Sequence, residues 1–219
     1  MITRRTFLGT AAGVGVLSLV PGTAAEAAGK GTKWTGAKSA NGWRITPSAI
    51  STYRIEGSRA SVALRQGVAA AVLLHIARRW HYEIAPVDTG DGGGITGHTT
   101  DREIQAKFQS NYLSGTALAV QSTAFPLGGS EKLWPYQEEI VRDILLDCEG
   151  TVAWGGDLNP AQASHFHLAV APGDKTLAGV AARLDTSVQL EFRAQTAGVV
   201  ADPATPSRRD RARRLPRRR

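Results

Sequence analysis

Cysteine is almost absent from this 219-residue sequence, since Cys148 is its only copy. The chain can therefore form neither an internal disulfide framework nor a cysteine-based zinc site. A metal site would have to be built from Asp, Glu and the five histidines. The glycine-rich run 90–94 matches no phosphate-binding fingerprint, because no Gly-Lys-Ser or Gly-Lys-Thr follows it, and it is typical of a surface loop. No internal repeat is visible either, so disulfide-stapled, P-loop and repeat proteins are excluded.

Basic charge is plentiful, but it is confined to one end of the chain. The formal net charge is +7 and the pI is near 10.0, values that are typical of nucleic-acid-binding proteins. Residues 207–219 alone contain eight Arg and one Asp, which accounts for the whole excess. The stretch 28–206, with 16 basic and 17 acidic side chains, is nearly neutral. The pattern therefore predicts no specific binding of nucleic acid. We expect the tail to be a solvated extension or to contact anionic cell-wall polymers or lipid headgroups.

The first 27 residues have the pattern of an export signal. Arg4 and Arg5 precede Thr-Phe-Leu and an apolar run over 9–20, and Ala-Glu-Ala at 25–27 fits a cleavage site. The adjacent arginines resemble a twin-arginine signal. The apolar run is shorter than the ~20 residues that span a bilayer. We therefore expect export by the twin-arginine route to the cell envelope or the extracellular space, with membrane contact only during export.

Between these ends, the pattern predicts one α+β domain in which a small antiparallel sheet packs with helices. The segments with helix-type patterns are 61–79, 135–148 and 174–184. The short apolar runs that are typical of strands are 116–120, 151–154 and 166–171. The expected divisions are a lead-in over 28–57, a domain over 58–188 and a C-terminal extension over 189–219 that carries the Arg-rich tail.

Two histidines lie two residues apart beside an expected strand. On a strand, the imidazoles of His165 and His167 would face the same side. Such a pair could bind zinc if a third ligand came from elsewhere, and His98 or Asp101 could supply it if the glycine-rich loop folded over the cleft. The alternative is a strand with one buried, hydrogen-bonded His and one solvent-facing neighbour.

Three ordered sequence blocks resemble the motifs of a known enzyme family. The motifs are S-x-H-x-x-G-x-A-x-D, then W-G-G-D, then a His that is followed by an aromatic residue. The residues that match them are Ser110, Gly115, Ala117, Trp154-Gly155-Gly156-Asp157 and His165-Phe166. In this order and spacing the blocks resemble the zinc D-alanyl-D-alanine carboxypeptidase and L-alanyl-D-glutamate endopeptidase family, which cuts peptidoglycan stem peptides. The resemblance covers about residues 60–185 and implies a zinc D-alanyl-D-alanine carboxypeptidase-like fold.

The resemblance also assigns positions of this chain to a zinc site. The family's His, Asp and His ligands fall on Tyr112, Ala119 and His165, and its general base, an acid, falls on Gln162. Zinc hydrolysis needs about three protein ligands and a base that takes a proton from the bound water. Because only His165 is retained, we assign no catalytic residue and do not expect Zn²⁺ to be bound in the family's manner.

Further candidate residues surround these positions. His167 and His98 are candidates for additional metal ligands, and Ser110, Arg102 and Trp154 are candidates for contacts with substrate. The resemblance then implies an exported peptidoglycan peptidase-like protein that is catalytically impaired or inactive and binds stem peptides. One alternative is an active zinc carboxypeptidase or endopeptidase with rearranged ligands. The other is a cell-envelope binding protein that acts through its basic tail.

Overall fold

The computed structural model describes residues 31–184 and 206–215, and the expected export signal lies outside these ranges. Its strands are β1 (Thr32–Lys33), β2 (Ile50–Arg54), β3 (Ser61–Arg65), β4 (Ile95–Thr96), β5 (Glu103–Ile104), β6 (Ala117–Val120), β7 (Val152–Trp154) and β8 (His165–Leu168). Its helices are α1 (Val68–Glu83), α2 (Pro135–Asp147), α3 (Lys175–Leu184) and α5 (Pro206–Arg213). Short 3-10 turns are η1 (Pro47–Ala49), η2 (Asp91–Gly93), η3 (Lys107–Tyr112) and η4 (Gly155–Asp157). Small antiparallel sheets combined with several helices confirm the expected α+β class.

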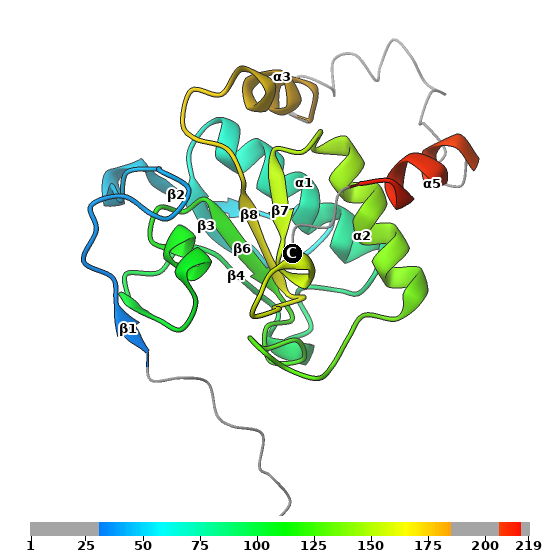
Figure 1. Cartoon of the computed structure of the whole chain (residues 1–219), viewed down its shortest axis with the longest axis horizontal. Helices are drawn as coiled ribbons and strands as arrows, with labels where there is room; N and C mark the ends of the chain where they lie inside the picture. The colour runs from blue at the N-terminus through cyan, green and yellow to red at the C-terminus, as the bar shows by residue number, and fades with distance from the viewer. Residues whose placement is uncertain (1–30, 185–205, 216–219) are drawn as a thin grey trace, which may run out of the picture.

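A four-stranded antiparallel sheet in the order β4–β6–β8–β7 lies at the centre of the molecule (Figure 1). The expected strands over 116–120, 151–154 and 166–171 are confirmed as β6, β7 and β8. Every residue of β6 and β8, the two inner strands, is buried. Because both faces of these strands are covered, β6 is a continuous apolar run, whereas β8 alternates two histidines with Phe166 and Leu168 and is buried all the same. Any polar side chain on β6 or β8 is therefore removed from water.

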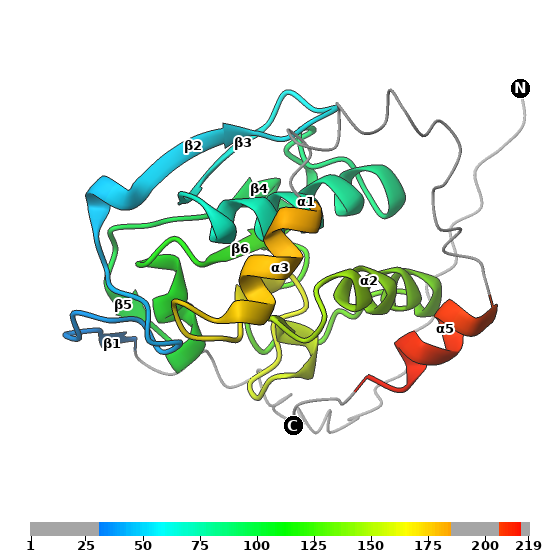
Figure 2. The same cartoon turned by 90° about the horizontal axis from the view of Figure 1, so that it is seen from above.

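Helix α1 occupies the middle of the hydrophobic core and contacts α2, α3 and the strands β3, β6 and β8. Its Trp80 ring meets the ring of Phe166 on β8 edge to face, with centroids 6.0 Å apart. Figure 2 shows α3 crossing α1, which places a helix on each side of α1. Helix α3 begins where the Leu177 amide donates to the Asp174 carboxylate at 2.8 Å, as the sequence predicts. None of the helices in the described ranges is long and apolar enough to cross a membrane.

The first part of the expected helix 61–79 is a strand. Val62 and Leu64 of β3 are buried, whereas the residues on either side of them are not, so the side chains alternate with the period of a strand. The helix begins only after Gly67, whose φ of 77° is unfavourable for any residue with a side chain. The Ala- and Leu-rich composition obscured this two-residue alternation, because it favours a helix equally well.

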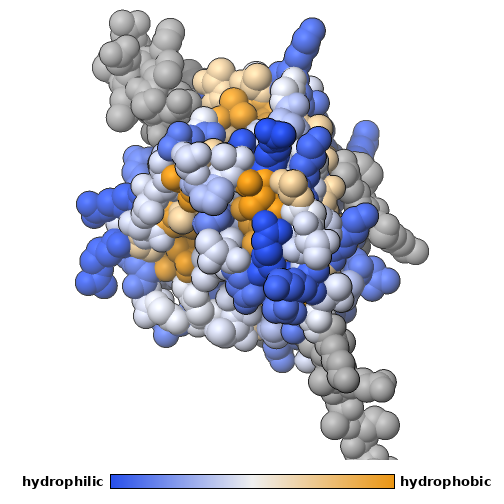
Figure 3. All heavy atoms as spheres, turned by 90° about the vertical axis from the view of Figure 1, so that its left-hand side faces the viewer, coloured by the Kyte–Doolittle hydropathy of each residue, from blue (hydrophilic) through white to orange (hydrophobic). Residues whose placement is uncertain are grey.

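The N-terminal residues 31–57 are paired with the rest of the domain rather than leading loosely into it. Strand β1 pairs with β5, and β2 forms a full antiparallel ladder with β3. The Ser39 hydroxyl lies within hydrogen-bonding distance of the Asn41 carboxamide oxygen and of the hydroxyl of Ser114, which is 75 residues away. Figure 3 views the side of the molecule that carries β1 and β2, where small apolar patches are separated by hydrophilic side chains. The sequence favours short strands or an ordered loop over 41–55, but it does not indicate these pairing partners, because the contacts are made by backbone groups and small hydroxyls.

Part of the Arg-rich tail forms a helix on the domain surface, which corrects the expectation of a solvated extension. Helix α5 contacts α2, and the two lie side by side in Figures 1 and 2. Its docking face is the i, i+4, i+7 row of Arg208, Ala212 and Leu215: Ala212 is 5% exposed and Leu215 packs against the core. The Arg208 guanidinium donates to the carboxylates of Asp143 and Asp147 on α2. Charge pairing therefore orders a segment whose composition alone predicts disorder.

Candidate functional site

The first motif block is held in place by the fold. The buried Ser110 hydroxyl donates to the Lys107 carbonyl at 2.8 Å and accepts from the Ala40 amide at 2.9 Å. Gly115 has a φ of 68°, and a Cβ there would lie 2.5 Å from the Ile50 side chain. Both residues are thus required where η3 turns into β6. The hydroxyl of Ser110, a candidate for substrate contact, therefore makes its hydrogen bonds to groups of the protein itself.

The W-G-G-D block is a second structural turn. The Trp154 indole donates to the Ala163 carbonyl at 2.7 Å, and the Arg142 guanidinium lies 4.8 Å from its ring centroid. Arg142 also makes a bidentate ion pair with Asp157, with N–O distances of 2.5 and 2.6 Å. A Cβ on Gly155 would lie 2.1 Å from the Gln162 carbonyl oxygen, so only glycine allows this close approach. Trp154, another candidate for substrate contact, is buried as a support for the turn.

Three positions that the resemblance assigns to zinc come together in space. In the β6–β8 ladder, Ala119 lies directly opposite His165. The Tyr112 hydroxyl, at the end of η3, lies 2.7 Å from Nδ1 of the same His165. Positions 112, 119 and 165 therefore meet at one end of the central sheet. The sheet register brings Ala119 to His165, and the η3 turn brings Tyr112.

The two histidines face the same side of β8, as the strand period predicts. Nε2 of His165 lies 2.9 Å from Nδ1 of His167, and their side chains are both buried. The Phe108 ring lies 4.7 Å from the His165 ring and is stacked on His167 with an interplanar angle of 6°. We call Tyr112, His165 and His167 the histidine cluster. It is a hydrogen-bonded chain in which both ring nitrogens of His165 are engaged.

Burial determines the charge state of the histidine cluster. Complete burial, followed by repulsion from His167, lowers the pKa of His165 well below its usual value. Burial also raises the pKa of the Tyr112 hydroxyl. At neutral pH, this hydrogen-bonded arrangement therefore joins the neutral phenol of Tyr112 to the neutral imidazole of His165. Either residue could pass a proton to its neighbour, but neither is an anion or a cation in the resting state.

The residues at this site do not fit a hydrolytic zinc ion. His165 would have to give up a hydrogen bond before either nitrogen could bind a metal, and Ala119 has no donor atom. Within residues 31–184 and 206–215, no group of three or more His, Cys, Asp or Glu side chains is placed to hold a metal ion. Of the suggested third ligands, the Asp101 carboxylate accepts from the Glu103 amide, and the His98 backbone amide is fixed to the Ala63 carbonyl. The donor set falls short of three.

The position of the general base carries an amide that is held by a neighbour. Oε1 of Gln162 accepts from Nε2 of Gln109 at 3.2 Å, and Gln109 in turn accepts from the amides at the start of η3. Arg102, the remaining candidate for substrate contact, donates to the carbonyls of Trp34 and Gly36. These contacts anchor the N-terminal segment to the site. Phe108 and Gln109 were missed from the sequence, although both belong to the same turn as Ser110.

A second polar cluster, which the sequence did not indicate, joins three helices. We call His75 and Arg79 of α1, Asp143 and Asp147 of α2 and Arg208 of α5 the carboxylate cluster. Arg79 contacts both carboxylates at 2.9 and 2.8 Å, and Nε2 of His75 lies 3.0 Å from Asp147. Burial alone would raise the pKa of Asp147, but hydrogen bonds with His75 and Arg208 hold it well below its usual range. Such pairings also allow Arg142 and Asp143 of α2 to be buried.

Comparison of the chain with protein-family models, with curated proteins and with solved structures finds no match in any of the three. The geometry of the described residues is therefore the basis on which a function is proposed.

Proposed function

We propose that this chain is an exported peptidoglycan peptidase-like protein with a zinc D-alanyl-D-alanine carboxypeptidase-like fold, and that it binds stem peptides without cleaving them. The observation that carries the proposal is the meeting of Tyr112, Ala119 and His165. These positions are 53 residues apart at the extremes and were assigned to one site by their resemblance to a motif. A chance resemblance gives no reason for them to converge.

Loss of cleavage follows from the chemistry of the replacements. Ala119 cannot coordinate a metal, and the buried Tyr112 keeps its proton because its pKa is raised. Gln162 cannot take a proton from water as a carboxylate would. Hydrogen bonds between Tyr112, His165 and His167 take the place of bonds to a metal, and they satisfy polar groups that would otherwise be buried alone.

Retention of peptide binding is supported by the side chains at the edge of the histidine cluster. Phe108, Gln109 and Tyr112, all from η3, are only partly buried. The Phe108 ring offers an aromatic face, while the Gln109 amide and the Tyr112 hydroxyl, which are already bonded to Gln162 and His165, would contact a peptide through their remaining hydrogen-bonding capacity. Recognition of a stem peptide needs such a surface, whereas cleavage needs the metal and the base.

Zinc content tests the loss of the metal site. The purified chain should contain far less than one zinc per molecule by elemental analysis, and zinc near one per chain that is lost in His165→Gln would instead support an active enzyme with rearranged ligands. The folded triple variant Tyr112→His, Ala119→Asp, Gln162→Asp should bind about one zinc. If this variant is folded by circular dichroism and still binds none, the proposed alignment is wrong.

Peptide binding needs its own measurement. We expect a synthetic stem peptide ending in D-alanyl-D-alanine to bind the chain in a calorimetric titration and to remain intact. Phe108→Ala should weaken that binding, because it removes the half-buried ring that stacks on the histidine cluster. Tyr136→Ala is a matched control, since it removes an aromatic ring that is 60% exposed on a different element. Equal affinities in both variants would contradict binding at this site.

A second candidate function is favoured by the outer face of α5. Arg209, Arg211, Arg213 and Arg214 are exposed on or just after a helix that is docked to the domain. Docking orders these guanidinium groups in advance, which suits contact with an anionic cell-wall polymer. Deletion of 207–219 should lower adsorption to isolated cell walls at low salt, and unchanged adsorption would rule this function out.

A further inference from the structure

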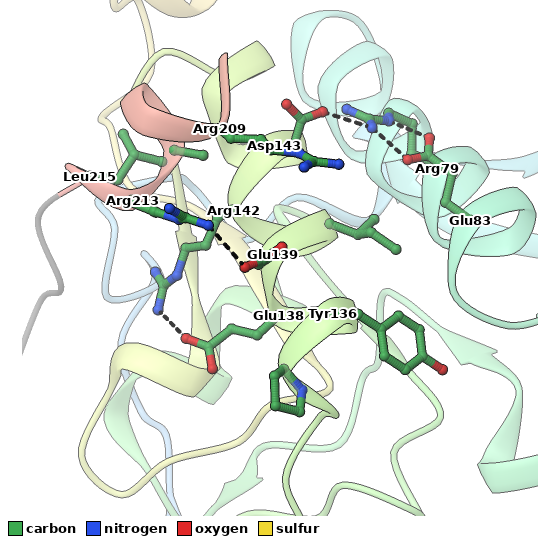
Figure 4. Close-up of a pocket in the computed structure, with 13 residues that line it drawn as sticks. Arg79, Glu83, Tyr136, Glu138, Glu139, Arg142, Asp143, Arg209, Arg213 and Leu215 are labelled. Carbon is green, nitrogen blue, oxygen red and sulfur yellow. Dashed lines mark hydrogen bonds and ion pairs between the residues drawn. The ribbon is translucent and has the colours of Figure 1, made fainter. Parts of the chain in front are cut away.

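A cavity of about 700 Å³ lies between α2 and α5, on the opposite side of the molecule from β1 (Figures 1 and 4). Its volume is in the range of pockets that bind small ligands. Helix α2 contributes one wall and α5 the opposite wall, while the end of α1 closes one side. The cavity shares no lining residue with the histidine cluster, so binding there is separate from stem-peptide binding, although Arg209 and Arg213 also belong to the arginines proposed to contact a cell-wall polymer.

The cavity has an apolar lining that remains open to a ligand. Ile140 of α2 and Ala212 and Leu215 of the C-terminal segment line it. The ring of Tyr136, which is 60% exposed, lies at its margin. Apolar and aromatic surface of this kind favours the carbon body of a ligand over bulk water.

Most of the charged groups around the cavity are already neutralised. Arg79 is paired with Glu83 and Asp143. Arg142 is paired with Asp157 of η4 and with Glu138 of α2. The arginines of these pairs are largely buried, and Figure 4 shows Arg79 paired with Glu83 and Asp143 at the wall of the cavity. These pairs therefore leave little charge to attract a ligand.

Two guanidinium groups of α5 remain for a ligand. Among the residues that the structure describes, Arg209 has no ion-pair or hydrogen-bond partner for its side chain, although it lines the cavity. Arg213 lines it too, four residues later and thus on the same side of α5. Its one partner is Glu139 at 3.5 Å, and both side chains are more than half exposed, so this pair is weak and easily exchanged.

We infer that the cavity between α2 and α5 binds a small ligand that combines an oxyanion with an apolar body. Arg209, joined by Arg213, would hold the oxyanion, because the planar guanidinium fork matches a carboxylate or a phosphate. Ile140, Leu215 and Tyr136 would cover the apolar body. Carboxylate and phosphate share this chemistry, so the test includes one probe of each.

The site exists only while α5 is docked. Arg208 holds α5 to Asp143 and Asp147, and this contact places Arg209 and Arg213 at the cavity. A ligand that touches both α2 and α5 therefore stabilises the docked helix by mass action. The Arg-rich tail becomes one wall of a binding site.

The test uses hexanoate, hexyl phosphate and neutral 1-hexanol as probes, each titrated into the full ¹⁵N-labelled chain. We expect at least one anionic probe to shift the amide signals of 136–143 and 209–215, and the tighter of the two identifies the preferred oxyanion. Arg209→Gln should weaken it about tenfold or more, since it removes a charge-assisted hydrogen bond. Arg211→Gln is the matched control, because this exposed arginine of α5 does not line the cavity, and its effect should be less than twofold.

Further variants separate this site from its alternatives. Arg208→Ala should abolish the amide shifts by undocking α5, and His165→Gln should leave the probe's affinity unchanged. The inference is overturned if 1-hexanol binds as tightly as the anions, if Arg209→Gln and Arg211→Gln weaken the anionic probe equally, or if none of the probes shifts these amides. The first result would mean an apolar cavity only, and the second a diffuse attraction to the charge of α5.

Discussion

The histidine cluster and the carboxylate cluster are both mostly removed from water, yet the first is neutral and the second is charged. His165 has no acid beside it, so burial lowers its pKa and leaves the imidazole neutral. Asp147 is partly buried as well, but His75, Arg79 and Arg208 surround it and keep it ionised. The same desolvation therefore has opposite outcomes, which depend on whether a counter-charge lies within contact distance.

The largest expected effect is the removal of one acid from the carboxylate cluster. Asp143→Ala leaves Arg208 with Asp147 alone and removes one partner of Arg79, in a place where the Asp143 side chain is only 9% exposed. Breaking a buried pair in this way costs about 3 kcal/mol of unfolding free energy. Urea denaturation followed by circular dichroism measures the loss.

Glu139→Ala is the matched control for that prediction. It removes an acid from the same helix, but its partner Arg213 is 65% exposed. The expected cost is below about 1 kcal/mol. Similar costs for the two variants would mean that burial does not distinguish the pairs.

Lowering the pH should reduce the free energy of unfolding by less than Asp143→Ala does, and the two clusters should respond in different pH ranges. In the folded chain His165 stays neutral, whereas in the unfolded chain it gains a proton near pH 6.5. Below pH 6.5, protons therefore bind preferentially to the unfolded state, and stability falls by up to about 1.4 kcal/mol per pH unit. The slope should be lower in His165→Gln, and an identical slope would contradict a neutral buried His165.

The stability contributed by the carboxylate cluster is also lost as the pH falls, but in a lower pH window. The pKa of Asp147 is lowered in the folded state, so its contribution is present above the unfolded value of 3.8 and is lost as the pH falls below it. Unfolding measured between pH 4 and pH 2 should show this loss in the parent chain and less of it in Asp147→Asn.

The smallest effect is expected from a single hydroxyl of the histidine cluster. Tyr112→Phe removes the hydrogen bond to Nδ1 of His165 and keeps the ring, so it should cost about 1 kcal/mol in urea unfolding. Tyr82→Phe is the control, because Tyr82 is 65% exposed, and it should change stability by less than about 0.5 kcal/mol. A cost for Tyr112→Phe no larger than that of the control would contradict the hydrogen-bonded chain.

Local patterns in the sequence predicted the elements that carry strong periodicity. The helix over 135–148 and the strands over 116–120 and 151–154 are confirmed, because each has a clear apolar pattern and a turn residue at its start or end. The pairing of His165 with His167 is confirmed for the same reason, since residues two apart share a strand face. The strand β3 was missed, because Val62 and Leu64 lie in a run of helix-favouring residues.

The sequence by itself determined the α+β class, the position of the excess charge and the side of β8 that both histidines face. All of these follow from composition or from a period of two or three to four residues. Only the tertiary structure decided that Tyr112 closes on His165, that Arg208 binds Asp143, and that a cavity forms beside α5. These contacts join residues 53 to 65 positions apart. Their energies depend on burial and counter-charge, which a linear pattern does not contain.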